Sequence, residues 1–244
     1  EFMLTLKNAV IGYQNPLILE TNLSLELGEM CLLLGNNGVG KTTLIKSVLG
    51  QIPLLSGEIF LQDKPVEKLS AIEIAQKISV VFSKAKVPHH YRLWDLIALG
   101  KYIHYPYYFE LTAEDKKSVD GVIEKLHLEQ YKNYQLTELS DGNLQKAFIG
   151  RALVQNTPMI ILDEPTTHLD EDNKLMILEL LREIVEVERK LLLFSSHDWR
   201  LAKDFSSKFW WVKDRKIEIG DLSQYPAENY QTMEQILSPM VVKP

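Results

Sequence analysis

One segment of the chain, Gly35-Asn-Asn-Gly-Val-Gly-Lys-Thr-Thr43, contains the types of residue that bind phosphate groups. It matches the pattern Gly-x-x-x-x-Gly-Lys-Ser/Thr through Gly35, Gly40, Lys41 and Thr42. Glycines let the backbone wrap closely, so that its N–H groups point at phosphate oxygens. The Lys41 ammonium adds a positive charge for the β- and γ-phosphates, and the Thr42 hydroxyl can ligate Mg²⁺. We therefore predict that the chain binds a nucleoside triphosphate together with Mg²⁺.

Two carboxylates follow an apolar run in the second half of the chain, Met159-Ile-Ile-Leu-Asp163-Glu164. Side chains alternate along a strand and Pro165 ends it, so we expect the two acids to point in different directions. One carboxylate could hold Mg²⁺ through its water shell while the other polarises an attacking water. An ordinary strand end explains such a pair equally well when it stands alone. Its place after a phosphate-binding loop favours the catalytic interpretation.

Two further candidates have weaker patterns. The segment Leu139-Ser-Asp-Gly-Asn143 stands before a helical pattern, where the Ser140 hydroxyl and free N–H groups could form an anion site. A simple helix cap explains this segment as well. His197 follows an apolar run at 191–194, and a histidine in such a place is most often structural. The same place lies at the carboxyl edge of a sheet, where α/β proteins bind ligands.

The elements that position these residues are predicted to form an α/β core with a helical insert. Apolar runs at 30–34, 159–162 and 191–194 are typical of parallel strands covered on both faces. Shorter strand signals stand at 4–6, 23–25 and 58–61, and the runs 209–212 and 216–219 predict a hairpin. Between about 86 and 156 the pattern is mostly helical, most clearly over 114–126 and 144–154.

Composition narrows the class of protein. The 244 residues are 45% apolar with a net charge of −6, which allows a substantial core and gives no electrostatic footprint for nucleic acid. The single cysteine, Cys31, excludes an internal disulfide and indicates a reducing compartment, and its apolar run predicts a buried, unreactive thiol. No uncharged apolar stretch reaches the length of a membrane span. Glu1 and Phe2 are interpreted as a cloning remnant, not as part of a signal peptide.

In their order along the chain, these motifs resemble the ATP-binding cassette (ABC) ATPase family. The loop at 35–43, the segment 139–143, the pair Asp163-Glu164, the segment 167–170 and His197 have the family's order and spacing. Tyr13 stands where the family carries an aromatic residue that stacks on adenine. The resemblance extends from about residue 3 to residue 220. It implies a P-loop NTPase core of ABC type, with an N-terminal antiparallel β subdomain and an inserted helical subdomain.

The resemblance also implies the limits of these parts. Residues 3–85 and 157–220 would form the ATP-binding α/β core with its β subdomain. Residues 86–156 would form the helical subdomain that carries the segment 139–143, and residues 221–244 a C-terminal tail. Residues 1–2 are left out as the cloning remnant.

The family's functional residues carry over to a head-to-tail dimer with two ATP molecules between the subunits. Glu164 would be the catalytic base and His197 the γ-phosphate contact, with Lys41 completing the catalytic set. ATP would be held by Tyr13, Gly35, Asn36, Asn37, Gly38, Val39, Gly40, Lys41, Thr42 and Thr43 of one subunit and by Ser140 and Gly142 of the other. Thr42 would hold Mg²⁺ directly and Asp163 through water, while Asp170 would communicate across the interface.

Two residues depart from the family pattern. Ser83 stands at the end of the run 80–83, where the family carries a glutamine that touches Mg²⁺ and the attacking water. Ser83 is therefore a shorter candidate Mg²⁺ contact, and we expect slower or less tightly coupled turnover. Asp141 stands where a glycine is commoner, and a charge pointing inward would oppose phosphate binding. We expect it to face outward and cap the helix.

A single cassette with a helical insert is typical of the ATPase subunit of a bacterial-type importer. The segments 96–102, 156–159 and 197–202 resemble those of iron-siderophore, haem and cobalamin importer ATPases. The implied partners are integral-membrane permease subunits, a second copy of the chain and, indirectly, a substrate-binding protein, with no nucleic acid. The implied location is cytoplasmic, on the inner face of the cell membrane through the permease.

Two questions stay open at this point. The aromatic residues Tyr102, Tyr105, Tyr107, Tyr108 and Phe109 could line a groove for a permease helix, or they could pack within the helical insert. The cassette could also energise a soluble assembly, such as iron–sulfur cluster assembly, instead of a transporter. Co-fractionation with an integral permease or with soluble assembly proteins would distinguish these two functions.

Overall fold

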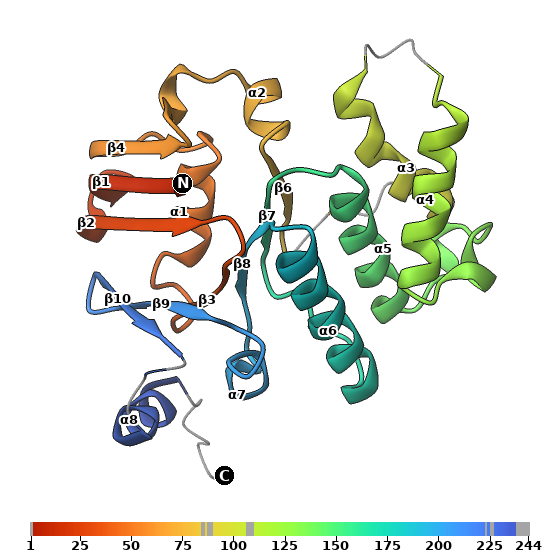
Figure 1. Cartoon of the computed structure of the whole chain (residues 1–244). Coiled ribbons are helices and arrows are strands. Elements are labelled where there is room, and N and C mark those ends of the chain that lie inside the picture. Colours follow the sequence, from red (N-terminus) through yellow and green to blue (C-terminus); the bar gives the residue numbers. More distant parts are fainter. Residues whose placement is uncertain are drawn as a thin grey trace.

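Two β-sheets form the centre of the protein, and helices pack beside them (Figure 1). The computed structural model describes residues 2–83, 86, 90–105, 110–222, 224 and 227–237. One sheet has six strands in the order β10-β9-β3-β8-β7-β6, and the other has four in the order β2-β1-β4-β5. The predicted α/β core with an antiparallel N-terminal sheet is confirmed.

The six-stranded sheet contains the strands predicted from continuous apolar runs. The parallel strands β3 (Met30–Leu34), β7 (Met159–Leu162) and β8 (Leu191–Ser195) are buried along their whole length. β6 (Ile78–Val81) pairs in parallel with β7, and β9 (Lys208–Lys213) pairs in parallel with β3. β10 (Lys216–Asp221) runs antiparallel to β9, which confirms the predicted hairpin. The parallel strands all end at the same edge of the sheet.

The four-stranded sheet is larger than the sequence indicated. It consists of β1 (Phe2–Gly12), β2 (Pro16–Glu26), β4 (Ser56–Leu61) and β5 (Lys64–Pro65). Pairing of β1 with β2 continues through several irregularities, one of them between Leu6 and Ala9, where Asn8 has a φ of 47°. Such bulges break the alternation of apolar and polar residues, so the pattern predicted only a short part of β1 and of β2.

The helical insert stands on the side of the six-stranded sheet away from the antiparallel sheet (Figure 1). It contains α3 (Leu93–Ala98), α4 (Ala113–Lys125) and α5 (Asp141–Val154), and the last two confirm the predicted helices. The 3₁₀ turns are Val66–Lys68, Leu99–His104, Glu129–Tyr131 and Leu136–Glu138, and the other helices are α1 (Lys41–Val48), α2 (Ala71–Ala75), α6 (Glu171–Val187), α7 (Trp199–Ala202) and α8 (Ala227–Leu237). α8 lies in the tail, where the sequence indicated no element. Within the described ranges, no helix has the length and apolar character needed to cross a membrane.

The start of α4 explains one of the aromatic residues in the insert. Thr112 and Asp115 form a capping box in which each side chain accepts the other residue's backbone N–H at 3.1 Å. The Tyr105 hydroxyl donates to the same Asp115 carboxylate at 2.8 Å, and the Tyr105 ring packs against the hydrophobic core. Tyr105 therefore follows the packing alternative, whereas Tyr102 is 38% exposed. Residues 106–109, with the other three aromatic residues, lie outside the described ranges.

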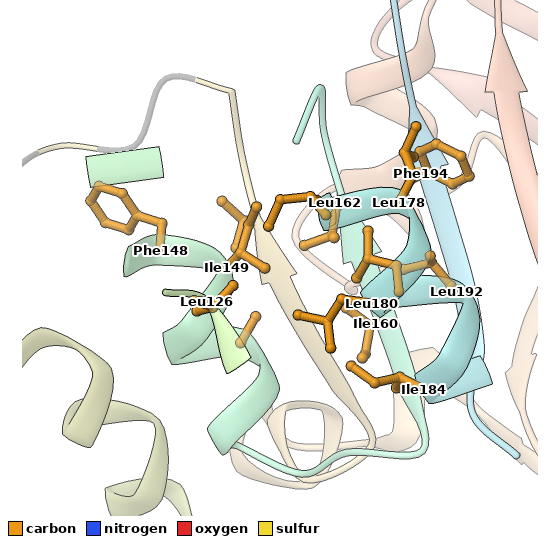
Figure 2. Packing of buried hydrophobic residues seen from close by; sticks show 14 of the residues in the cluster. Leu126, Phe148, Ile149, Ile160, Leu162, Leu178, Leu180, Ile184, Leu192 and Phe194 are labelled. Atoms are coloured by element: carbon orange, nitrogen blue, oxygen red, sulfur yellow. The ribbon is translucent and has the colours of Figure 1, made fainter. Parts of the chain in front are cut away.

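Side chains of the six-stranded sheet alternate between two hydrophobic cores. Leu32 of β3 faces one core, which it shares with α5 and α6, while Cys31 and Leu33 face the other, shared with α1 and the antiparallel sheet. Figure 2 shows the first core, where Ile160 of β7 lies among side chains of α6 and Leu192 of β8. Burial raises the pKa of the Cys31 thiol, in agreement with the predicted unreactive state.

Two glycines of the insert test how tightly its helices pack. A Cβ on Gly100 would lie 2.3 Å from the Arg151 carbonyl oxygen and 2.7 Å from Val154 Cγ1, so Gly100→Ala should lower the free energy of unfolding by about 2–3 kcal/mol. Gly121 lies inside α4 with no atom within 4 Å of an added Cβ, so Gly121→Ala should raise the free energy of unfolding by about 0.5–1 kcal/mol. Urea unfolding measures both variants, and equal stabilities would contradict this packing.

Candidate active site

The phosphate-binding stretch forms the loop between β3 and α1. Gly35 and Gly40 have φ values of 151° and 113°, a region that glycine adopts without strain. A Cβ on Gly35 would also lie 2.8 Å from Val39 Cγ2 and 2.9 Å from the Val212 carbonyl oxygen. Gly40 precedes α1 and supplies no side-chain cap, so the first N–H groups of the helix can turn to an anion.

The Lys41 side chain folds back over this loop from the start of α1. Its ammonium group donates to the carbonyl oxygens of Gly35 and Asn36, the latter at 3.2 Å. Burial lowers the pKa of Lys41 below its ordinary value, and the charges of Glu164 and Asp163 partly oppose this shift. A phosphate is a stronger acceptor than a carbonyl because it is charged, so the ammonium group is placed to transfer to one.

The two acids after β7 have different partners, as predicted. Asp163 is 5% exposed and accepts a hydrogen bond from the Ser195 hydroxyl, with 2.6 Å between Oγ and Oδ1. Glu164 has a φ of 56° and its backbone N–H donates to the same hydroxyl at 2.9 Å. The Glu164 carboxylate instead meets His197, with 2.7 Å between Oε1 and Nε2. His197 therefore contacts a catalytic candidate and is not an isolated structural histidine.

One cavity of about 480 Å³ collects most of the predicted nucleotide site. It is lined by Leu17, Asn37, Gly38, Gly40, Lys41, Thr42, Thr43, Ser83, Asp163, Glu164 and His197. Segments that follow β3, β6, β7 and β8 meet here because these parallel strands end at one edge. A larger hollow of about 1260 Å³ lies between the antiparallel sheet and the β9–β10 hairpin, and its lining contains none of these residues.

The oxygen atoms in this cavity suit Mg²⁺. Thr42 and Ser83 supply hydroxyls and Asp163 supplies a carboxylate, and hard cations of this size bind oxygen ligands. The described residues contain no cluster of three or more His, Cys, Asp or Glu side chains that could hold a metal ion. The donor set therefore fits an ion that takes its other ligands from phosphates and water.

Of the nucleotide contacts predicted within one subunit, four lie outside this cavity, namely Tyr13, Gly35, Asn36 and Val39. Tyr13 is 60% exposed on the turn between β1 and β2, and Leu17 of the same hairpin lines the cavity in its place. The Asn36 side chain donates to the Ile236 carbonyl oxygen of α8 at 3.2 Å. Val39 packs against the second core. Stacking of Tyr13 on adenine stays a prediction.

Ser140 and Gly142 line a second cavity, of about 370 Å³, which shares no residue with the first. Its lining consists of Ser140, Asp141, Gly142, Asn143, Lys146, His168, Leu169, Asp170 and Asn173. Ser140 caps α5 by accepting the Asn143 N–H at 3.2 Å, so the expectation that Asp141 caps the helix was wrong. The shorter serine hydroxyl, one residue earlier, is the group that reaches this N–H. Asp141 is exposed in the first turn of α5, where its negative charge interacts favourably with the positive end of the helix dipole.

Lys146 links the two sides of the second cavity and was not identified from the sequence. It is 5% exposed on α5, and its ammonium group donates to Asn173 Oδ1 at 3.2 Å. Asn173 donates to both Asp170 carboxylate oxygens, at 2.8 and 3.0 Å, where Asp170 caps α6. The helix that begins after Ser140 is thereby tied to the loop that ends at Asp170. A lysine directly before the apolar run 147–149 is the signal that could have indicated this link.

This chain is similar to several known proteins. The family described as ABC transporter matches residues 18–167. An uncharacterized ABC transporter ATP-binding protein of Methanocaldococcus jannaschii is 31% identical, over 88% of this chain and 74% of that protein. The iron(3+)-hydroxamate import ATP-binding protein of Bacillus subtilis is 30% identical, over 80% of this chain and 73% of that protein. A solved dimeric ATP-binding cassette in a post-hydrolysis state with ADP and Pi has a TM-score of 0.82 at 24% identity, over 91% of this chain and 100% of that one.

The link between α5 and α6 can be measured as a coupling energy. Asn173→Ala should destabilise the fold by about 2 kcal/mol, because the buried Lys146 ammonium loses its partner and Asp170 loses its side-chain donor. Adding Lys146→Met should recover part of this loss, since the unpaired charge is removed. Urea unfolding of the single and double variants gives the coupling, and simple additivity would contradict the link. Asn133→Ala, at an exposed position, should change stability by less than about 0.5 kcal/mol.

Proposed function

Because this chain belongs to the ABC transporter family, we propose that it powers an importer of iron-siderophore complexes or other metal chelates. The chain is the ATP-hydrolysing subunit, since the ATP-binding cassette of this family is an ATPase. The observation that carries the hydrolytic part of the proposal is the Glu164 carboxylate, 2.7 Å from His197 Nε2 in the same cavity as Lys41 and Thr42, and the import function is supported by the similar import proteins.

ATP would bind with its phosphates over the start of α1. The uncapped N–H groups after Gly40 and the Lys41 ammonium would take the phosphate oxygens in place of the carbonyl groups that Lys41 contacts in this structure. Thr42, with Asp163 through water, would hold Mg²⁺ beside them. The bound ion would supply positive charge where negative charge develops on the phosphates.

Hydrolysis would use the pair formed by Glu164 and His197. A water oxygen attacks the γ-phosphorus while the bond to the bridging oxygen breaks, so that ADP leaves and inorganic phosphate forms. Glu164 takes the proton of that water as general base. The His197 side chain is 60% exposed where it contacts Glu164 Oε1, so its ring can turn from Glu164 to the γ-phosphate without disturbing the core.

A second copy of the chain would complete each site. The phosphate cavity and the cavity of Ser140 and Gly142 share no residue, so one subunit does not bring the two sets together. Cassettes of this family dimerise and work with membrane permeases. We propose a head-to-tail homodimer in which Ser140 and Gly142 face the γ-phosphate bound by the other subunit.

The substrate class is supported by relatives of this chain. The iron(3+)-hydroxamate import protein matches it over most of both chains, which favours a chelate importer over an ATPase of a soluble assembly. We propose that the homodimer lies on the inner face of the cell membrane, bound to permease subunits. A substrate-binding protein would deliver the substrate to these permease subunits. Of the aromatic group 102–109, Tyr102 is exposed among the described residues, and we propose it as a permease contact.

Glu164→Gln should lower kcat for ATP hydrolysis by about a hundredfold or more, because the general base is lost while its shape is kept. ATP affinity should stay close to that of the unmodified chain, whereas Lys41→Ala should weaken it strongly. Phosphate release and fluorescent-nucleotide binding measure the two quantities. Glu186→Gln, which changes an exposed glutamate of α6, is the control and should alter neither. Unchanged hydrolysis in Glu164→Gln would contradict the assignment of the base.

Transport requires the permease that co-purifies with the chain from membranes. Proteoliposomes that contain this complex should take up a radioactive ferric hydroxamate when ATP is present on the side of the cassette, and the Glu164→Gln complex should not. Co-purification with soluble iron–sulfur assembly proteins, without any membrane protein, would contradict the importer and favour the other function.

Ser83→Gln should raise kcat by roughly two- to tenfold, the rate equivalent of one added hydrogen bond to the attacking water. Ser83 lines the phosphate cavity, but its hydroxyl is shorter than a glutamine amide. Ser83→Asn carries the same amide on a shorter stem and should gain less. Steady-state ATPase assays compare the three proteins, and equal rates would contradict a limiting role for Ser83.

A further inference from the structure

Ser195 ends β8 and is 1% exposed, directly beside the two acids of the active site. The residues before it, 191–194, are apolar and fill the two cores on either side of the sheet. A buried hydroxyl is unfavourable in such surroundings unless it is hydrogen-bonded. The role of Ser195 therefore follows from its hydrogen-bond partners.

The Ser195 hydroxyl joins the two acids to each other. It donates to Asp163 Oδ1 at 2.6 Å and accepts the Glu164 backbone N–H at 2.9 Å. The direction of each bond is fixed, because an ionised carboxylate can only accept and a backbone N–H can only donate. The hydroxyl thus occupies one lone pair of Asp163 Oδ1, on a carboxylate that lines the phosphate cavity.

Glu164 depends on this contact because the chain leaves the sheet at this residue. The Asp163 N–H still donates to the Val81 carbonyl oxygen at 2.8 Å, on the β6 side. Glu164 then adopts a φ of 56°, which is uncommon for residues other than glycine, and its N–H turns to the β8 side. There the Ser195 hydroxyl accepts the Glu164 N–H, as a carbonyl oxygen of a neighbouring strand would within the sheet. Two residues later, His197 contacts the carboxylate of the same glutamate at 2.7 Å.

We propose that Ser195 is a positioning residue for ATP hydrolysis, an inference that rests on the proposed function of the site. From the end of β8 it holds the backbone of Glu164, both while His197 contacts the Glu164 carboxylate, as in this structure, and after the His197 ring has turned to the γ-phosphate. It also fixes the rotation of the Asp163 carboxylate, which would face Mg²⁺ through water. Nothing in the motifs of the sequence assigns a role to this serine.

Ser195→Ala tests the role by removing the hydroxyl with little change in volume. It should lower kcat by about tenfold or more, because the buried Asp163 carboxylate and the partly buried Glu164 N–H both lose their partner. It should also raise severalfold the Mg²⁺ concentration at which a fluorescent ATP analogue reaches half-saturation. Ser195→Thr, which keeps the hydroxyl, should restore most of both values.

Ser79→Ala is the matched control for a loss of stability alone. Ser79 is fully buried in β6, and its hydroxyl shares a hydrogen bond with Thr157 Oγ1 at 3.0 Å, away from the acids. This variant should lose stability comparable to that of Ser195→Ala and keep the original kcat and Mg²⁺ dependence.

Three results would overturn the proposal. The first is an unchanged Mg²⁺ half-saturation in Ser195→Ala, and the second is an equal loss of kcat in Ser195→Ala and Ser79→Ala. The third is a Ser195→Thr protein that has the melting temperature of the unmodified chain but the low kcat of Ser195→Ala. Failure of the proposed function has a different signature, because the unmodified chain would then show no hydrolysis that depends on Glu164. The Mg²⁺ titration of nucleotide binding would still decide the role of Ser195.

Discussion

The register between β7 and β8 is the constraint on which the active site depends. Leu162 pairs with Phe194, so the next residues of the two strands, Asp163 and Ser195, emerge together at the sheet edge. Alternate residues of both strands face opposite cores. A slip of one residue would exchange the two faces and expose each core to the wrong partners, so the register is strongly specified. The distances among the candidate catalytic groups therefore depend on the packing of the strands that precede them.

The same packing connects the sheet to the second cavity. The core on the α6 side continues from Ile160 and Leu192 through α6 to Ile149 of α5, the helix that Ser140 caps (Figure 2). At its other end, α6 is capped by Asp170, which Asn173 and Lys146 tie back to α5. The residues that would contact the ATP of a second subunit are therefore carried by the core that also supports the acids. A displacement of α5 would therefore change the packing against β7.

The parts of the site that could be predicted from the sequence are those encoded by neighbouring residues. The phosphate loop, the pair Asp163-Glu164 and His197 each follow an apolar run, and parallel strands bring such ends together whatever their order in the sheet. Ser195 could not be identified in this way because its partners lie on another strand, and only the register shows that they meet. The link from Lys146 to Asn173 depends on how two helices approach. The full length of β1 was hidden for another reason, since its bulges interrupt the pattern that marks a strand.

The burial of Cys31 has a practical consequence for observing this protein at work. It is the single cysteine of the chain, it is fully buried in β3, and its raised pKa keeps the thiol protonated. A thiol-reactive dye would therefore leave it untouched. A cysteine introduced on the exposed surface of α4 or α6 would then carry the dye alone, without removal of a native residue. Energy transfer between dyes on two subunits would then test the proposed approach of the phosphate loop of one subunit to Ser140 of the other.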